Sequence, residues 1–275
     1  MTTPTTTSNS IRPPPRFEIR PLTPEHIPWA RAIITHSNIF HSPVWTKLYP
    51  TNQTARAYAF YAASEKLMTL NTLSGYSYGV FDTEYVFRRP ESVSTGGKLY
   101  WDFNNTSATA EELLEQMDFP LVSIAMAHDA AEEGRDNSEW AAVIEKLPRL
   151  GTLFGEIEKM DTRDPKVWKP EEKLEVIYRG GTSTRADYEG LGLAKTLGHW
   201  CMVEWARAGF RAMQVGAAHP AVVRILLNPP KPFRGEVVAR LNTLEYEEAG
   251  EDGAVVRPFA VAGDVPCVRI WVDFK

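Results

Sequence analysis

The segment TRADYEGLGLAKTL, residues 184–197, joins a predicted strand to a predicted helix through a turn that contains Gly190 and Gly192. Apolar residues recur at four-residue steps behind this turn, which predicts a helix over 190–208. Gly209 follows and can end that helix in a left-handed conformation. Free backbone N–H groups at a helix N-terminus bind phosphate or pyrophosphate, and glycine lets the oxygens approach them. The turn therefore predicts an anion site.

Two well-known phosphate motifs do not fit this turn. A Walker A loop needs G-x-x-x-x-G-K-[ST], but here the Lys195-Thr196 pair follows Ala194 and not glycine. A dinucleotide fingerprint needs G-x-G-x-x-G, and its third glycine position is occupied by Lys195. The turn also comes late in the chain, after several predicted strands, with no βαβ unit ahead of it. The sequence therefore favours neither of these nucleotide-binding classes.

The segment DYEGLGLA resembles the Gln/Arg-x-x-Gly-x-Gly/Ala turn of the GNAT superfamily of acyl-CoA-dependent N-acetyltransferases. Asp187 takes the first place, Tyr188 supplies the aromatic that usually follows, and Gly190 and Gly192 take the glycine places. The downstream segment GFRAMQVGAAHPAVVRILLNPP is similar to the next strand and short helix of that fold, and the NPPKPF loop resembles fungal members. The resemblance is close over about Glu175 to Asn228, and it extends to the rest of the chain through the order of elements.

This resemblance implies acetyl-CoA or coenzyme A as the cofactor. Backbone groups near Thr184 and Arg185 would meet the pantetheine and the thioester, in a gap where the strand that carries them splays from its neighbour. Asn228 is assigned to the same site, and the turn's backbone would hold the pyrophosphate through Gly190, Leu191, Gly192, Leu193, Ala194 and Lys195. Asp187 and Glu189 stand where basic residues are frequent in the superfamily, so their carboxylates have to point away from a bound pyrophosphate.

Acyl transfer to an amine needs a base and a proton donor. Glu175 lies on the strand that often carries the superfamily's glutamate base, but a solvent-facing strand carboxylate explains it as well. His219 ends the next strand, and it is either a base or proton shuttle or a cap of the short helix. Tyr178 and Ser183 are candidates for the acid that protonates the departing thiolate, or ordinary strand residues. The superfamily's Asn and Tyr are replaced here by His219 and Leu226.

Aromatic residues and histidines gather in HSNIFHSPVWTKLY, residues 36–49, a region that helps to line the acceptor pocket in GNAT folds. Phe40, His41 and Trp45 therefore predict an apolar or aromatic amine over a polyamine, with core packing as the alternative. His128 ends a buried strand and either orients the acceptor or completes that strand. The sequence has no His-x-x-x-His or Cys-x-x-Cys pair, so we predict no metal.

Composition and charge limit the partners and the cellular compartment that the sequence predicts. A formal net charge of −5 disfavours nucleic acid and anionic membrane surfaces as partners. The chain has only two cysteines and no apolar leader, which predicts a cytoplasmic protein. Residues 1–16 are rich in Thr, Ser and Pro and predict a disordered tail. Residues 17–275 are expected to form one GNAT-like domain, with a helical insertion over 130–173 as a lid on the acceptor site.

The predicted fold class is α+β: a central, mostly antiparallel, splayed sheet flanked by helices, with the helical insertion ahead of the CoA-binding strand. The predicted function is acyl transfer from a CoA thioester, acetyl-CoA in the first place, to a small-molecule amine. Two alternatives stay open. In one, a GNAT-fold protein binds CoA or a partner without transferase activity; in the other, it uses the thioester for O-acylation or decarboxylation.

Overall fold

A computed structural model describes residues 11–132 and 138–275. At its centre lies one sheet of seven strands in the order β1-β2-β5-β6-β7-β11-β8. Neighbouring strands are antiparallel except for the parallel pair β6 and β7. The strands are β1 (Phe17–Pro21), β2 (Tyr78–Asp82), β5 (Leu121–Asp129), β6 (Val176–Thr184), β7 (Ala212–Ala217), β8 (Arg234–Leu241) and β11 (Cys267–Asp273). The mostly antiparallel sheet confirms the predicted fold class.

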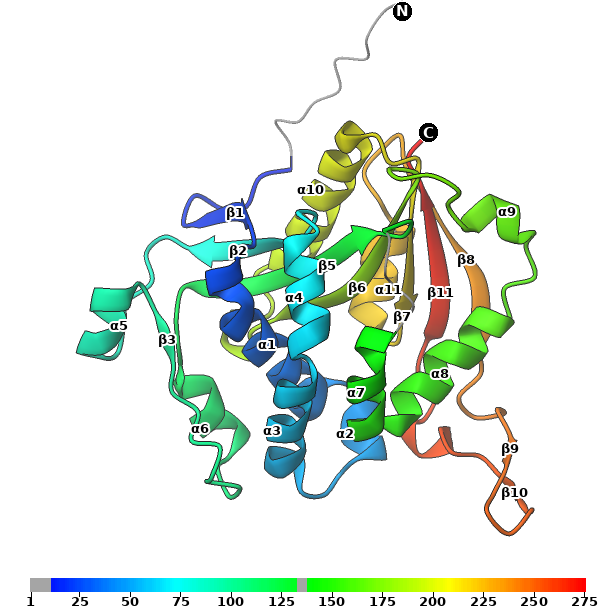
Figure 1. The fold of residues 1–275 in the computed structure, drawn as a ribbon, viewed down its shortest axis with the longest axis horizontal. Helices are drawn as coiled ribbons and strands as arrows, with labels where there is room; N and C mark the ends of the chain where they lie inside the picture. The colour runs from blue at the N-terminus through cyan, green and yellow to red at the C-terminus, as the bar shows by residue number, and fades with distance from the viewer. Residues whose placement is uncertain (1–10, 133–137) are drawn as a thin grey trace, which may run out of the picture.

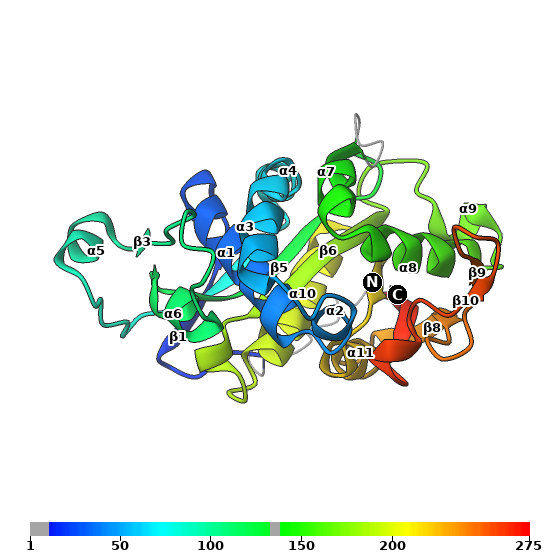
Figure 2. The ribbon, with the colours of Figure 1, turned by 90° about the horizontal axis from the view of Figure 1, so that it is seen from below.

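Helices cover both faces of this sheet and bury a separate apolar core on each (Figure 1, Figure 2). One face carries α1 (Ile27–His36), η3 (Ser37–His41), α2 (Trp45–Leu48), α3 (Gln53–Ala63), α4 (Glu65–Leu73), α7 (Ser138–Lys146) and α8 (Pro148–Lys159). The other face carries α10 (Leu193–Ala208) and α11 (Pro220–Leu227). The helix predicted over 190–208 is confirmed over Leu193–Ala208, and it ends at Gly209 with a φ of 109°.

Strands β6 and β7 separate soon after they meet. Their parallel pairing joins Val176–Tyr178 to Ala212–Gln214 and stops there. Just beyond it, the register between β5 and β6 skips one residue of β6, a bulge that places Gly180 opposite no partner. A bulge bends its strand, and it allows β6 to leave β7 at this point. A Cβ at Gly181 would stand 2.8 Å from the Ile34 side chain, so glycine also lets α1 pack closely against the bend.

The predicted insertion over 130–173 holds α7, α8 and the short α9 (Pro165–Trp168), and residues 133–137 of it lie outside the described residues. The remaining short elements are η2 (Pro24–His26), α5 (Pro90–Thr95), β3 (Lys98–Leu99), α6 (Ala110–Glu115), β4 (Met117–Asp118), η4 (Ala186–Tyr188), β9 (Glu248–Ala249), β10 (Val255–Val256) and η5 (Ala260–Ala262). Of the tail predicted over 1–16, residues 1–10 lie outside the described residues. Arg16, within the described part, pairs with Asp82 at 2.6 Å.

Candidate active site

The glycine turn leads directly into α10. Gly190 and Gly192 adopt φ angles of 78° and 75°, a left-handed conformation in which glycine is favoured. A Cβ at either position would meet nothing within 4 Å, so the space above the turn is open. The amides of residues 190–195 donate to no acceptor among the described residues, and the first intrahelical bond is donated by Thr196 to Gly192. The turn therefore presents free donors at the positive end of a 16-residue helix.

Arg185 holds the acidic start of this turn away from those donors. Its Nε and Nη2 donate to the Asp187 carboxylate at 3.1 and 2.8 Å, and its Nη1 donates to the Met117 and Phe119 carbonyls at 3.0 and 2.9 Å. The Arg185 side chain is 1% exposed, and these bonds fix it at the start of the turn. Arg185 does not line the cavity described below, and the contact predicted between its backbone and the cofactor stays a prediction. Asp187 is neutralised by its partner, as a bound pyrophosphate would require.

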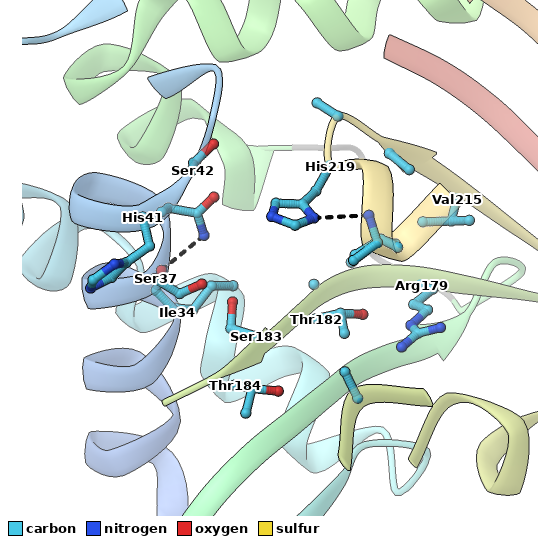
Figure 3. A pocket seen from close by; sticks show the side chains of 18 of the residues that line it. Ile34, Ser37, His41, Ser42, Arg179, Thr182, Ser183, Thr184, Val215 and His219 are labelled. Atoms are coloured by element: carbon cyan, nitrogen blue, oxygen red, sulfur yellow. Dashed lines mark hydrogen bonds between the residues drawn. The ribbon is translucent and has the colours of Figure 1, made fainter. Parts of the chain in front are cut away.

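A cavity of about 530 Å³ fills the gap between β6 and β7 (Figure 3). It passes through the sheet, because residues from the helices on both faces line it. From one face come Ile34, Ser37, Asn38, His41, Ser42, Trp45, Phe60, Ser64, Leu67, Met68, Trp140, Leu150 and Phe154. From the other come the glycine turn, the first residues of α10, and α11. Trp140, Leu150 and Phe154 belong to α7 and α8, so the insertion does form part of one wall.

Ten of the predicted site residues line this cavity: His41, Trp45, Ser183, Thr184, Gly190, Gly192, Leu193, Ala194, Lys195 and His219. Ser183 Oγ is buried and has no hydrogen-bond partner among the described residues. Figure 3 shows Ser183 and His219 directed into the gap, while the His41 ring turns away from it. That ring lies 5.0 Å from the His36 ring.

His219 has the capping role that the sequence allowed, and it also lines the cavity. It is the N-cap of α11, where its Nδ1 accepts a hydrogen bond from the Ala221 amide at 3.2 Å. Since Nδ1 is the acceptor, the neutral ring carries its proton on Nε2. Burial lowers the pKa of His219 and favours that neutral form. The ring therefore offers the cavity an N–H donor, and it is not placed to act as a base while the cap is intact.

The structure does not bring four of the other predicted residues to the cavity. Glu175 precedes β6, at the end of the strand away from the gap, and pairs with Arg211 at 3.3 Å. Tyr178 lies where β6 and β7 are still paired, with its ring 5.1 Å from that of His128. His128 is buried, and its Nδ1 is 2.8 Å from the Asn71 side-chain oxygen. Asn228 donates to the Arg224 carbonyl at 2.8 Å and closes the C-terminus of α11.

Two more predicted residues, Phe40 and Leu191, also lie outside the cavity lining. The Phe40 ring packs 5.2 Å from the His36 ring, which corresponds to the core-packing alternative. Leu191 is 52% exposed at the tip of the turn, because the left-handed glycines on either side turn its side chain outward.

Arg179 is a buried, charged lining residue that sequence reasoning missed. It is 2% exposed, and its Nε and Nη1 have no hydrogen-bond partner among the described residues. The available signal was a lone basic residue in the otherwise apolar and small strand VIYRGGTST.

Within residues 11–132 and 138–275, no group of three or more His, Cys, Asp or Glu side chains is arranged to hold a metal ion. No helix there is both long and apolar enough to cross a bilayer.

Comparison with solved structures identifies the fold of this chain. No protein-family model and no curated protein sequence matches the chain. Among solved structures, arylalkylamine N-acetyltransferase 2 from Aedes aegypti matches with a TM-score of 0.57 and 12% identity, over 94% of this chain and 98% of that one. The C-terminal condensation domain of Ebony, in complex with beta-alanyl-dopamine, matches with a TM-score of 0.54 and 15% identity, over 93% and 98%. The chain therefore has the fold of the GNAT acetyltransferases.

Proposed function

We propose that this protein is an acyl-CoA-dependent N-acyltransferase that acylates a small amine. The cavity is the observation that carries the proposal, because it joins the glycine turn on one face of the sheet to a chamber on the other. Aromatic and aliphatic side chains line this chamber, together with Ser37, Asn38, His41, Ser42 and Ser64. A thioester held at the turn and an amine held in the chamber would meet inside the β6–β7 gap. The GNAT fold, shared with an arylalkylamine N-acetyltransferase, supports the same reaction.

The residues of the turn fit the phosphate end of coenzyme A. The free amides of Gly192, Leu193 and Ala194 would donate to a pyrophosphate, and the Lys195 side chain adds a positive charge beside them. The open space above Gly190 would admit the phosphate oxygens. Coenzyme A supplies an acyl group activated on sulfur, and the chain's own residues bind and orient it.

The chamber on the helical side favours an aromatic or apolar amine. Its wall is rich in aromatic rings, among them Trp45, Phe60, Trp140 and Phe154. Among the described lining residues the only carboxylate is Glu189, which lies on the turn side. A polyamine would require carboxylates in the chamber. The Aedes aegypti neighbour is described as an arylalkylamine enzyme, and the Ebony structure holds beta-alanyl-dopamine, which agrees with this choice.

Two side chains at the gap can handle protons and developing charge. The Nε2–H of His219 would donate to the thioester oxygen or to the departing sulfur. Ser183 Oγ, buried and without a partner among the described residues, would accept a hydrogen bond from the amine and orient its lone pair. The amine proton would then leave through water in the open part of the cavity.

Release of CoA thiol with purified protein tests this proposal. Thiol release should require both a CoA thioester and an amine, and 2-phenylethylamine should exceed putrescine. Ser37→Phe narrows the chamber and should raise the KM for the amine while CoA affinity stays unchanged. Thiol release that is independent of any amine would contradict the proposal, and so would CoA binding without turnover across the amine panel.

A further inference from the structure

Arg179 is a buried cation that the described residues leave uncompensated. Its side chain lines the cavity just beyond Tyr178, the last residue of β6 that pairs with β7. Its Nε and Nη1 have no hydrogen-bond partner among the described residues, and none of the described carboxylates forms an ion pair with it. Its electrostatic neighbours among the described residues are the Cys201 thiol and the His199 ring. Burial raises the pKa of the thiol to about 12 and lowers that of the ring, so both are neutral and neither compensates the charge.

Two other buried arginines of this chain, Arg185 and Arg31, have partners that compensate their charge. Arg185 has a carboxylate and two carbonyls as partners. Arg31 donates to the Tyr61 carbonyl and pairs with Glu65 at 3.2 Å. Arginine keeps its charge when it is buried, although burial lowers the pKa of Arg179. An isolated buried charge is costly, so an unpaired one that faces a cavity indicates an anion that arrives with the ligand.

The position of the guanidinium indicates which ligand carries this anion. A Cβ placed on Gly198 of α10 would stand 3.5 Å from both Nη1 and Nη2 of Arg179. Arg179 therefore faces the same side of the sheet as the glycine turn, about 7.5 Å along α10 from its first residue. The acceptor chamber lies on the other face, and in Figure 3 its residues Ile34 and His41 lie at the opposite end from Arg179.

We propose that Arg179 binds a carboxylate at the far end of the acyl group, so that the donor is the CoA thioester of a dicarboxylic acid, such as a malonyl or succinyl thioester. This inference rests on the proposed function, and it replaces the acetyl group that the sequence predicts. The reaction itself is unchanged. The amine nitrogen bonds to the thioester carbon, the C–S bond breaks, and the sulfur leaves as CoA thiol with the equivalent of the amine's proton. The amide product keeps the free carboxylate on Arg179.

Calorimetric binding of CoA, acetyl-CoA, malonyl-CoA and succinyl-CoA to the whole protein tests the inference. Hydrogen bonds to a charged group contribute about 1.5–3 kcal/mol, so the wild type should bind one of the dicarboxylic thioesters about ten- to a hundredfold more tightly than acetyl-CoA. Arg179→Met should lose this preference and keep its acetyl-CoA affinity, which also reports that it is folded. Arg179→Lys keeps the charge without the planar fork and should retain part of the preference.

Three outcomes would overturn the inference, and they are distinguishable. Equal affinity of the wild type for acetyl-CoA and both dicarboxylic thioesters would refute it and leave the proposed function standing. If Arg179→Met instead raises only the KM of a carboxylate-bearing amine such as phenylalanine, the carboxylate belongs to the acceptor. If none of the four compounds binds the wild type, the proposed function fails as well.

Discussion

Replacing Arg179 by methionine should make the ligand-free protein more stable. Methionine has a similar length and is apolar, so the substitution removes an unpaired charge that is 2% exposed and leaves little empty space. Replacing buried charges by apolar side chains of similar volume commonly gains about 1–4 kcal/mol. We take about 2 kcal/mol, a value inside this range. For a protein of this size that gain corresponds to a rise in Tm of roughly 4–8 °C.

Arg185→Met is the matched control for this prediction. Arg185 is as buried as Arg179, but its guanidinium is bonded to Asp187 and to the carbonyls of Met117 and Phe119. Its removal takes the donor from the Asp187 carboxylate and the Phe119 carbonyl, while the Met117 carbonyl still accepts from the Tyr85 hydroxyl. This should cost about 3 kcal/mol and lower the Tm by roughly 6–12 °C. Thermal unfolding followed by circular dichroism, without ligand, measures both. A fall in Tm for Arg179→Met as large as that for Arg185→Met would refute the reasoning, because it would show that Arg179 has a partner within the protein.

Two further predictions concern other residues. Burial raises the pKa of Asp82, but hydrogen bonds from Arg16 and Tyr188 outweigh this and the net pKa lies below the ordinary value. The stability that ionised Asp82 contributes is therefore complete above about pH 3.9, and it is lost as the pH falls through the lower pKa of the folded state. Asp82→Asn should therefore make the Tm less dependent on pH at the acid end of a profile over pH 2–7. An unchanged acid end would exclude a stabilising role for the Asp82 carboxylate. His219→Ser keeps a side-chain acceptor for the Ala221 amide but removes the N–H group that faces the cavity. Turnover should therefore fall about a hundredfold while the Tm stays unchanged. A fall in both turnover and Tm would show that His219 acts only as a helix cap.

The parts of the site that depend on local sequence could be predicted. The glycine turn and α10 follow from residue type and helical spacing, and Gly209 ends the helix as predicted. The helix begins at Leu193 and not at residue 190, because Gly190 and Gly192 are both left-handed. These features depend only on residues that are neighbours in the sequence, so a single sequence is enough to predict them.

The parts that depend on long-range packing could not be predicted. The position of Glu175 relative to the gap depends on where β6 leaves β7, which the bulge at Gly180 sets. The burial of Arg179 depends on the approach of α10 at Gly198, nineteen positions further along the chain. The placement of Arg185 beside Asp187 depends on the distant carbonyls of Met117 and Phe119, which accept hydrogen bonds from the same guanidinium. Such contacts leave no periodic pattern in the sequence.

The central claim is that the turn at Gly190 holds the pyrophosphate of coenzyme A. Calorimetric titration of CoA into the wild type, Gly190→Glu and Gly253→Glu tests it most directly. Gly253 lies between β9 and β10, shares the φ of 78° and the open surroundings of Gly190, and does not line the cavity, so it controls for strain and added charge. We predict that CoA binds the wild type and Gly253→Glu equally and that Gly190→Glu loses at least tenfold in affinity. Equal CoA binding by all three proteins, or no binding by the wild type, would contradict the account.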